Sequence, residues 1–510
     1  SMSYFLGVDI GTSSTKTILI TETGKILGES TASYPLNYPK PMWSEQNPDH
    51  WWRATLKTIR DVILKSGVDA MQVKAIGLSG QMHGSVFLDK DDQVIRPALL
   101  WNDQRTVAEC NEIESKAGGR AELIRMVANP ALTGFTAPKI LWLRNNEPRN
   151  FDRLKKILLP KDEVRRRLTG CYATDVSDAS GMLLLDVGRR KWSTKLMGKL
   201  DLDTDLFGEV FESEDVTGTL TKKSARLLGL SVDCLVVGGA GDCAANALGT
   251  GVVQSGIVST SIGTSGVTFI HSDEMQFDKQ GRLHTFCHAV RGKWHMMGVN
   301  LCAGGSLQWF ADNLATAGKL DVFQAMNRAA AKVDVGSDGL FFLPYLAGER
   351  TPHCDPLARG CFIGLTMSHT QGHMVRSVME GVTYSLRDSL EIFQDMNVPV
   401  KQIRTSGGGA KSKLWREMQA NVLGKKVVTI NTEQGPALGV ALLAAVGAGA
   451  YSNIGEACNA VIKETSVTPV QQKIKRAYDK RFPIYQRLYQ SLKQDFGDIA
   501  NLVSPSGVTQ

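Results

Sequence analysis

Two aspartates stand where an apolar strand runs into a turn of small residues, a setting that leaves a carboxylate open to a ligand. The first is Asp9, which ends the apolar run from Phe5 and is followed by the turn Gly11-Thr12-Ser13. A carboxylate at Asp9 could hold Mg²⁺, directly or through water, while N–H groups of the turn meet phosphate oxygens. The alternative is an aspartate that stabilises its own hairpin by side-chain hydrogen bonds.

Asp242 is the second, and it follows the run Val236-Val237-Gly238-Gly239-Ala240-Gly241. The small residues before it leave room for a substrate, and the start of the helix that follows favours its negative charge. A general base must lie roughly 2.6–3.2 Å from the hydroxyl that it deprotonates, and this open setting permits such an approach. The alternative is an ordinary helix N-cap aspartate. Because a cap does not need so much surrounding glycine, we expect a catalytic role.

The strand-turn-strand pattern around Asp9 occurs again in the second half of the chain. Residues 257–270 repeat it, and 400–407 parallels 73–80 in the same order. Two similar halves that each offer N–H groups on a hairpin turn indicate two lobes that grip a polyphosphate between them. The predicted phosphate contacts are Gly11, Thr12, Ser13, Lys16, Gly263, Thr264 and Ser265.

Two polar segments in the first half suit an uncharged substrate with many hydroxyls. One is Gln81-Met82-His83-Gly84, expected on a loop at a sheet edge, and the other is Trp101-Asn102-Asp103. They supply neutral donors and acceptors with one carboxylate, and no arginine cluster is aimed at a sugar acid or sugar phosphate. We expect Met82, His83, Trp101, Asn102 and Asp103 to contact the substrate, although His83 taken alone would equally suit a structural histidine.

A glycine-rich segment near the C-terminal end, 406–412, resembles a phosphate loop but lacks the GxxxxGK[ST] spacing. Gly408 and Gly409 could let the backbone lie flat against a nucleoside. Ser412 is a candidate cap for the helix that follows.

The composition limits the classes of protein to which the chain can belong. It has 510 residues, 43% hydrophobic and 21% charged, with a formal charge of +7. This length and composition are typical of an ordinary globular protein of two or three domains. The positive charge is spread thinly along the chain, which argues against a nucleic-acid partner. The sequence has no uninterrupted run of about eighteen apolar residues, so we expect no membrane-spanning helix. Nine scattered cysteines without a CxxC pair favour reduced thiols, so we expect a cytoplasmic protein.

Strands and helices alternate along the chain, which predicts an α/β fold of two similar lobes with a ligand cleft between them. We expect an N-terminal lobe over 3–245, a C-terminal lobe over 246–500 and a loose tail over 501–510. Helices are predicted over 48–66, 436–450 and 471–497.

These residues resemble the FGGY family of carbohydrate kinases, whose lobes have the actin-like (ribonuclease H-like) ATPase fold. Segment 134–142 is similar to one family signature, and 360–365 with His373, Ser377 and Glu380 is similar to the other. Within the family, the closest similarity is to members that phosphorylate xylulose. It is carried by the segments 79–84, 101–103, 159–162 and 407–412.

The resemblance implies ATP and Mg²⁺ as cofactors and a ketopentose, D-xylulose, as substrate. Asp242 would then be the base that activates the C5 hydroxyl, Asp9 would position Mg²⁺, Met82 and His83 would line the sugar site, and Gly408 and Gly409 would meet the adenosine. A homodimer is possible by the same analogy.

One departure concerns the residue after Asp242, because many relatives have Asn or Gln where this chain has Cys243. Loss of that amide removes a sugar hydrogen bond, so the substrate could be ribulose, gluconate, glycerol or a tetritol. A rival from another class is an actin-like ATPase switch, which would hydrolyse ATP without any sugar.

Overall fold

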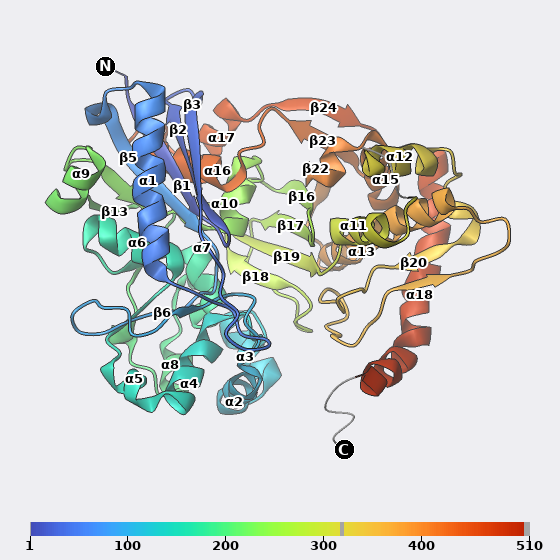
Figure 1. Ribbon diagram of the computed structural model, residues 1–510, viewed down its shortest axis with the longest axis horizontal. Helices are drawn as coiled ribbons and strands as arrows, with labels where there is room; N and C mark the ends of the chain where they lie inside the picture. The colour runs from blue at the N-terminus through green and yellow to red at the C-terminus, as the bar shows by residue number, and fades with distance from the viewer. Residues whose placement is uncertain (1, 317–320, 504–510) are drawn as a thin grey trace.

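The computed structural model describes residues 2–316 and 321–503, which form two lobes, each built around one large sheet (Figure 1). The first sheet has the order β13 (Val216–Thr219), β14 (Leu235–Val237), β5 (Val73–Gly80), β1 (Tyr4–Ile10), β2 (Ser14–Thr21) and β3 (Ile26–Ser33), and β15 (Ala240–Gly241) pairs with the end of β5. The second has the order β18 (His284–Cys287), β19 (Trp294–Asn300), β17 (Gly266–Ser272), β16 (Gly256–Ile262), β22 (Val400–Gly407), β23 (Lys426–Ile430) and β24 (Glu464–Thr468).

The two sheets repeat one another down to single residues, which confirms the internal repeat expected from the sequence. β1 is antiparallel to β2 and parallel to β5, and β16 is likewise antiparallel to β17 and parallel to β22. Asp9 pairs with Ser79 in the first lobe, and Ser261 pairs with Ser406 at the equivalent place in the second. Even the register irregularity at the start of the parallel pair recurs, after Tyr4 and after Gly256.

Short two-stranded sheets pack around the two large ones. They pair β4 (Glu45–Gln46) with β7 (Ala98–Leu99), β6 (Val86–Leu88) with β8 (Lys156–Leu158), β9 (Ala173–Asp175) with β12 (Glu209–Phe211), β10 (Leu185–Asp186) with β11 (Lys191–Trp192), and β20 (Phe341–Leu343) with β21 (Cys361–Ile363).

Helices cover both faces of the sheets, as the buried parallel strands require. In the first half they are α1 (Pro48–Ser66), α2 (Val107–Ala117), α3 (Arg120–Val127), α4 (Thr136–Asn146), α5 (Pro148–Arg153), α6 (Pro160–Thr169), α7 (Val176–Ala179), α8 (Thr194–Lys199), α9 (Lys222–Leu228) and α10 (Asp242–Gly249). In the second half they are α11 (Gly304–Asn313), α12 (Val322–Ala331), α13 (Gln371–Asp395), α14 (Gly408–Lys411), α15 (Lys413–Leu423), α16 (Gly435–Gly447), α17 (Ile454–Val461) and α18 (Gln472–Val503).

One helix of the second half, α16, packs against the sheet of the first lobe and beside α10, as Figure 1 shows. The approach is close because glycines line it: a Cβ on Gly7 would lie 1.9 Å from the Ala437 carbonyl oxygen, and one on Gly77 would lie 1.9 Å from that of Val440. Small side chains along α16 complete a buried cluster that joins both halves of the chain. The packing therefore crosses the lobe division at residue 245 that the sequence suggested.

The C-terminal helix extends farther than the sequence pattern predicted. α18 continues to Val503, so residues 501–503 of the expected loose tail are helical, and residues 504–510 lie outside the described residues. Within the described ranges, no helix has both the length and the apolar character needed to cross a bilayer.

Candidate active site

Three neighbouring parallel strands of the first sheet end together and bring the two candidate aspartates to one edge. Ser79 on β5 pairs with Asp9 on one side and with Ala240 of β15 on the other. In the next row Gly80 pairs with Ile10 and Gly241, and Asp242 follows directly. Carboxyl ends of parallel strands are where α/β proteins place their ligands.

The two carboxyl groups influence one another electrostatically. Burial raises the pKa of Asp9 to about 7, with a further contribution from the negative charge of Asp242. Burial also raises the pKa of Asp242 to about 6, whereas a hydrogen bond from the backbone N–H of Cys243 partly lowers it. Asp9 Oδ1 is buried without a hydrogen-bond donor among the described residues. This pair of carboxylates would be stabilised by a cation.

Asp242 is the first residue of α10, whereas the N-cap position belongs to Gly241 and carries no side-chain cap. The simple N-cap alternative for Asp242 is therefore not what the structure shows. Asp242 is only partly buried, so its carboxylate keeps some access to a ligand.

The first hairpin turn is held in place from several directions. The phenol of Tyr34 donates to the Gly11 carbonyl at 2.6 Å, and the Gln46 amide donates to the Thr12 carbonyl at 2.6 Å. Trp101 Nε1 donates to Thr12 Oγ1 at 2.9 Å. The expected substrate residue Trp101, which is 46% exposed, thus also contacts the predicted phosphate turn.

The other two residues predicted to contact phosphate near this turn, Lys16 and Ser13, differ in their exposure to solvent. Lys16 pairs with Asp9 across the hairpin and is half-buried, and its ammonium lies 3.8 Å from Glu29. Ser13 at the tip of the turn is exposed.

The second hairpin turn is fixed by the start of α11. Gly304 N donates to the Gly263 carbonyl at 2.7 Å, and Ala303 N and Gly305 N donate to that of Thr264 at 2.8 and 3.1 Å. A Cβ on Gly304 would lie 2.5 Å from the Gly263 oxygen, so the close approach needs glycine. Gly263, Thr264 and Ser265 are exposed.

Next to this turn lies a largely apolar pocket of about 520 Å³. Its walls come from the second hairpin, α11, α12, α13 and the 408–415 segment. They comprise Ile262, Gly304, Leu307, Asp321, Phe323, Gln324, Asn327, Val375, Met379, Gly408, Lys411, Ser412 and Trp415. A cavity of this size and character accommodates a nucleoside.

One of the two glycines predicted to meet the adenosine lines that pocket. Gly408 lines it, whereas Gly409 is buried behind it, where a Cβ would lie 2.5 Å from the Ile262 side chain. Ser412 caps α15 by accepting from Trp415 N at 3.2 Å, and its hydroxyl donates to Asn327 Oδ1 at 3.1 Å.

Met82 lies against the loop that carries Asp242, and the next residue, His83, contacts Gly181. A Cβ on Gly241 would lie 2.9 Å from Met82 Sδ, and His83 Nδ1 forms a hydrogen bond with the Gly181 carbonyl at 2.8 Å. Burial lowers the pKa of His83 to about 3, and the charge of Lys139 adds to this effect. The imidazole is therefore neutral at pH 7, so it offers an uncharged polar edge to a ligand.

Residues from the second half of the chain also surround His83, which the sequence did not indicate. The His83 ring lies 5.0 Å from that of Phe135 and 6.2 Å from that of Phe286 on β18. Arg350 Nη1 lies 3.3 Å from His284 Nε2 in the same surroundings. These residues are far apart in the chain, and no local pattern predicts that they meet.

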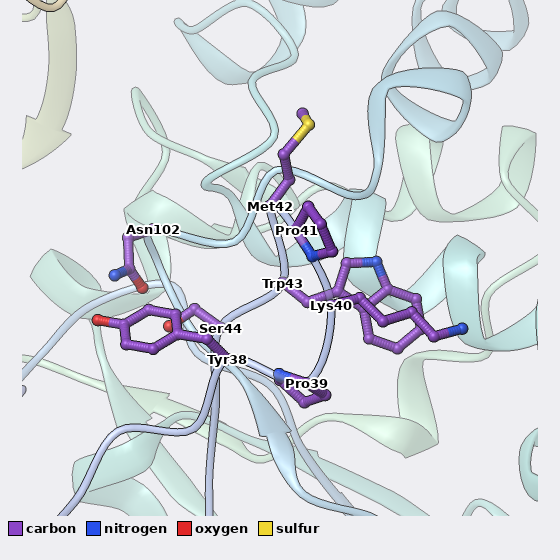
Figure 2. A pocket seen from close by; sticks show the side chains of 8 residues that line it. All are labelled: Tyr38, Pro39, Lys40, Pro41, Met42, Trp43, Ser44 and Asn102. Carbon is purple, nitrogen blue, oxygen red and sulfur yellow. The ribbon is translucent and has the colours of Figure 1, made fainter. Parts of the chain in front are cut away.

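Asn102 and Asp103 face different surroundings. Asn102 lines a pocket of about 500 Å³ made otherwise by residues 38–44. Figure 2 shows its amide on the side of the Tyr38 phenol, opposite Lys40 and Trp43. Asn102 Oδ1 has no hydrogen-bond donor among the described residues.

Asp103, by contrast, is completely buried and paired. Its carboxylate accepts from Ser44 N at 2.8 Å and lies 2.7 Å from the Arg105 guanidinium. The geometry therefore argues against the expected direct contact between Asp103 and a sugar. The arginine two residues onward occupies the oxygens that a substrate would need.

Cys243 lies beside the Asp242 carboxylate and is partly buried. Burial raises the pKa of the Cys243 thiol well above its ordinary value, and the charge of Asp242 adds to this shift. The thiol therefore stays protonated, and it offers only a weak hydrogen bond at a position next to the candidate base.

Comparison with known proteins agrees with this architecture over almost the whole chain. The pattern described as "FGGY family of carbohydrate kinases, N-terminal domain" matches residues 4–249, and that of the C-terminal domain matches residues 258–448. A xylulose kinase of Bacillus subtilis is 39% identical over 96% of this chain and 98% of its own, and a gluconokinase of the same organism is 29% identical over 98% of both.

A solved structure supports the same assignment. The "xyloylose kinase" from Brucella ovis superposes with a TM-score of 0.91 and 34% identity, covering 96% of this chain and 99% of that one. With two matched domains, these relatives and the paired sheets, the chain belongs to the FGGY family of carbohydrate kinases.

Proposed function

We propose that the protein transfers the γ-phosphoryl group of ATP to a ketopentose, D-xylulose, at its C5 hydroxyl, with Asp242 as the general base. The observation that carries this proposal is the position of Asp242 at the ends of β5 and β15, with Met82 against the preceding residue Gly241. The xylulose kinase relative is 39% identical, against 29% for the gluconokinase relative, which favours the ketopentose over the sugar acid.

The proposed chemistry at Asp242 is proton transfer from the attacking hydroxyl. A carboxylate with a pKa of about 6 is ionised at pH 7 and still basic enough to share a proton in the transition state. Met82 closes the site on the side of Gly241, and neutral His83 can hydrogen-bond a sugar hydroxyl without attracting an anion. The alcohol oxygen then bonds to the γ-phosphorus as the bond to the leaving ADP oxygen breaks.

Mg²⁺ fits the residues at the strand ends. Asp9 Oδ1 is a buried acceptor without a hydrogen-bond donor among the described residues, and the negative charge of Asp242 acts on the same carboxyl group. Mg²⁺ is commonly held by one or two carboxylates together with substrate phosphates. When bound, the ion neutralises negative charge on the phosphates. Asp9 would hold it, directly or through water.

The nucleotide is assigned to the second lobe. The apolar pocket lined by Gly408 and Ser412 would take the nucleoside, and the exposed turn at Gly263–Ser265 would meet the phosphates. The first hairpin turn would meet the phosphates from the first lobe, and Trp101 Nε1 supports it by donating to Thr12 Oγ1 at 2.9 Å. Lys16 adds positive charge near Asp9.

A coupled assay for ADP release tests the proposal with D-xylulose, ribulose, gluconate, glycerol and a tetritol, and with no sugar. We expect turnover to be highest with D-xylulose and near background without sugar. Asp242→Asn, which keeps the size of the side chain, should reduce kcat by about 10²–10⁴-fold because the base is lost. Its Kd for ATP should stay close to the wild-type value.

Three outcomes would contradict the proposal. Faster turnover of ribulose, gluconate, glycerol or a tetritol than of D-xylulose would show that the enzyme prefers another substrate, as the cysteine at position 243 would then indicate. ATP hydrolysis that no sugar accelerates would favour the switch ATPase. If Asp242→Asn kept more than a tenth of the wild-type turnover, Asp242 would not be the general base.

A further inference from the structure

A completely buried ion cluster lies under the loop that leads to Asp242. We define the ion cluster as Lys161, Asp162, Arg165, Asp175 and Asp178, each with no exposed surface. Lys161 Nζ lies 2.9, 2.7 and 2.8 Å from carboxylate oxygens of Asp162, Asp175 and Asp178. Because burying ions costs several kcal/mol each, such a cluster is weak evidence for stability alone.

The cluster reaches the loop at its first end through Arg165. Its guanidinium donates to the Val237 carbonyl at 2.6 Å and also to the Gly238 carbonyl. Asp162 accepts from the same guanidinium at 3.4 Å. Arg165 therefore holds the last residue of β14 and the first glycine of the loop.

A second connection reaches the far end of the loop through Ser177. Asp175 caps α7 by accepting from Ser177 N at 2.8 Å, and the Ser177 hydroxyl donates to the same Asp175 oxygen. Ser177 Oγ in turn accepts from Gly241 N at 3.2 Å. Gly241 is the residue immediately before Asp242, so this hydrogen bond fixes the backbone that carries the base.

The loop needs such support because its own residues specify little. Gly239 has a φ of 72°, and a Cβ there would lie 2.0 Å from the Leu78 carbonyl oxygen, so the position requires glycine. Glycine has no side chain to restrict its backbone. The segment of three glycines and Ala240 therefore does not select one backbone conformation by itself. Contacts from outside must therefore set the position of Asp242.

We infer that Ser177, oriented by Asp175, and Arg165 are positioning residues that set where the Asp242 carboxylate stands. The inference rests on the proposed role of Asp242 as base. Displacement of a catalytic group by about 1 Å can reduce a rate by about 10²-fold. Other contacts also hold the loop, among them the pairing of β15 with β5 and the hydrogen bonds from Gly238 N to the Asp215 carbonyl at 2.8 Å and from Gly239 N to the Ser213 carbonyl at 3.0 Å. Loss of the Ser177 contact alone should therefore shift the loop by less than this, so the expected loss in kcat is about tenfold.

The test compares Ser177→Ala with Ser213→Ala. Ser213 Oγ donates to the same Asp175 oxygen at 3.3 Å, and Ser213 is 2% exposed. Its backbone carbonyl accepts from Gly239 N of the loop at 3.0 Å, a contact that alanine keeps, whereas the structure gives its hydroxyl no hydrogen bond to the loop. Each variant deletes one buried hydroxyl from the same carboxylate, so a general loss of stability affects both. Ser177→Thr keeps the acceptor and should restore turnover.

We expect Ser177→Ala to lower kcat about tenfold with little change in the Kd for ATP, and Ser213→Ala to lower it less than twofold. Equal losses in the two variants, or no loss in Ser177→Ala, would overturn the inference. If Ser177→Ala does not fold, Ser177→Cys and Ser213→Cys replace the pair with the same expectations. Asp242→Asn assayed in parallel separates the two claims: an active Asp242→Asn contradicts the base role, whereas an inactive one with unaffected Ser177→Ala contradicts only the positioning role.

Discussion

Replacement of Asp9 by asparagine should stabilise the ligand-free protein while it abolishes turnover. Burial and the nearby charge of Asp242 raise the pKa of Asp9 from 3.8 to about 7. The folded state therefore binds more protons than the unfolded state between these values, and the free energy of unfolding falls as pH rises through this range. Asparagine has no charge to bury, so it escapes this cost.

The size of the effect follows from the pKa shift. A shift of one unit corresponds to about 1.4 kcal/mol, so the cost of ionising Asp9 reaches about 4 kcal/mol above pH 7. Because Asp9 keeps partial contact with solvent, we expect about 2–4 kcal/mol at pH 8. At pH 5 most of Asp9 stays protonated in the folded state, and the cost falls to about 1–2 kcal/mol.

Thermal unfolding of the wild type and Asp9→Asn at pH 5 and pH 8, with EDTA and no nucleotide, measures the difference. The variant should have the higher Tm at pH 8, and its advantage should shrink at pH 5. A matched control is Asp61→Asn: Asp61 accepts a hydrogen bond from Ser30 Oγ at 3.2 Å and is not among the groups that shift the pKa of Asp9. The same Tm difference at both pH values, or a less stable Asp9→Asn at pH 8, would refute the electrostatic argument.

Three further outcomes follow from the same structure. The kcat/KM for sugar should fall at least about tenfold between pH 7 and pH 5, because the pKa of Asp242 is about 6 and only its ionised form accepts a proton, while protonation of Asp9, with a pKa of about 7, adds to the fall; a profile flat to pH 5 would contradict this. Trp101→Phe removes the 2.9 Å hydrogen bond to Thr12 and should raise the KM for ATP about threefold to tenfold, measured by initial rates; an unchanged KM would mean that the turn is held without it. Gly77→Ala places a methyl group 1.9 Å from the Val440 carbonyl oxygen and should lower the Tm of the protein by several degrees, whereas Gly198→Ala, where a Cβ meets nothing within 4 Å, should leave it within about 1 °C.

Local sequence patterns determined much of the fold. The helix predicted over 48–66 is α1, bounded by the Asn47 cap and by Gly67 in the left-handed conformation. The two hairpins and their repeat were predictable because a strand, a glycine turn and a strand depend on hydrogen bonds between near neighbours. For the same reason Asp9 and Asp242 could each be placed at the end of a strand.

Only the tertiary structure decided which of these residues meet. Asp103 accepts from Ser44 N across 59 residues because the fold buries both, and α16 crosses to the first sheet because Gly7 and Gly77 admit its backbone. Likewise, Arg165 reaches Val237 across 72 residues. Contacts of this kind depend on how elements pack and on which charges burial forces together, and such long-range energies leave no periodic pattern in the chain. The sequence by itself thus determined the chemical groups and their local settings, and packing determined their partners.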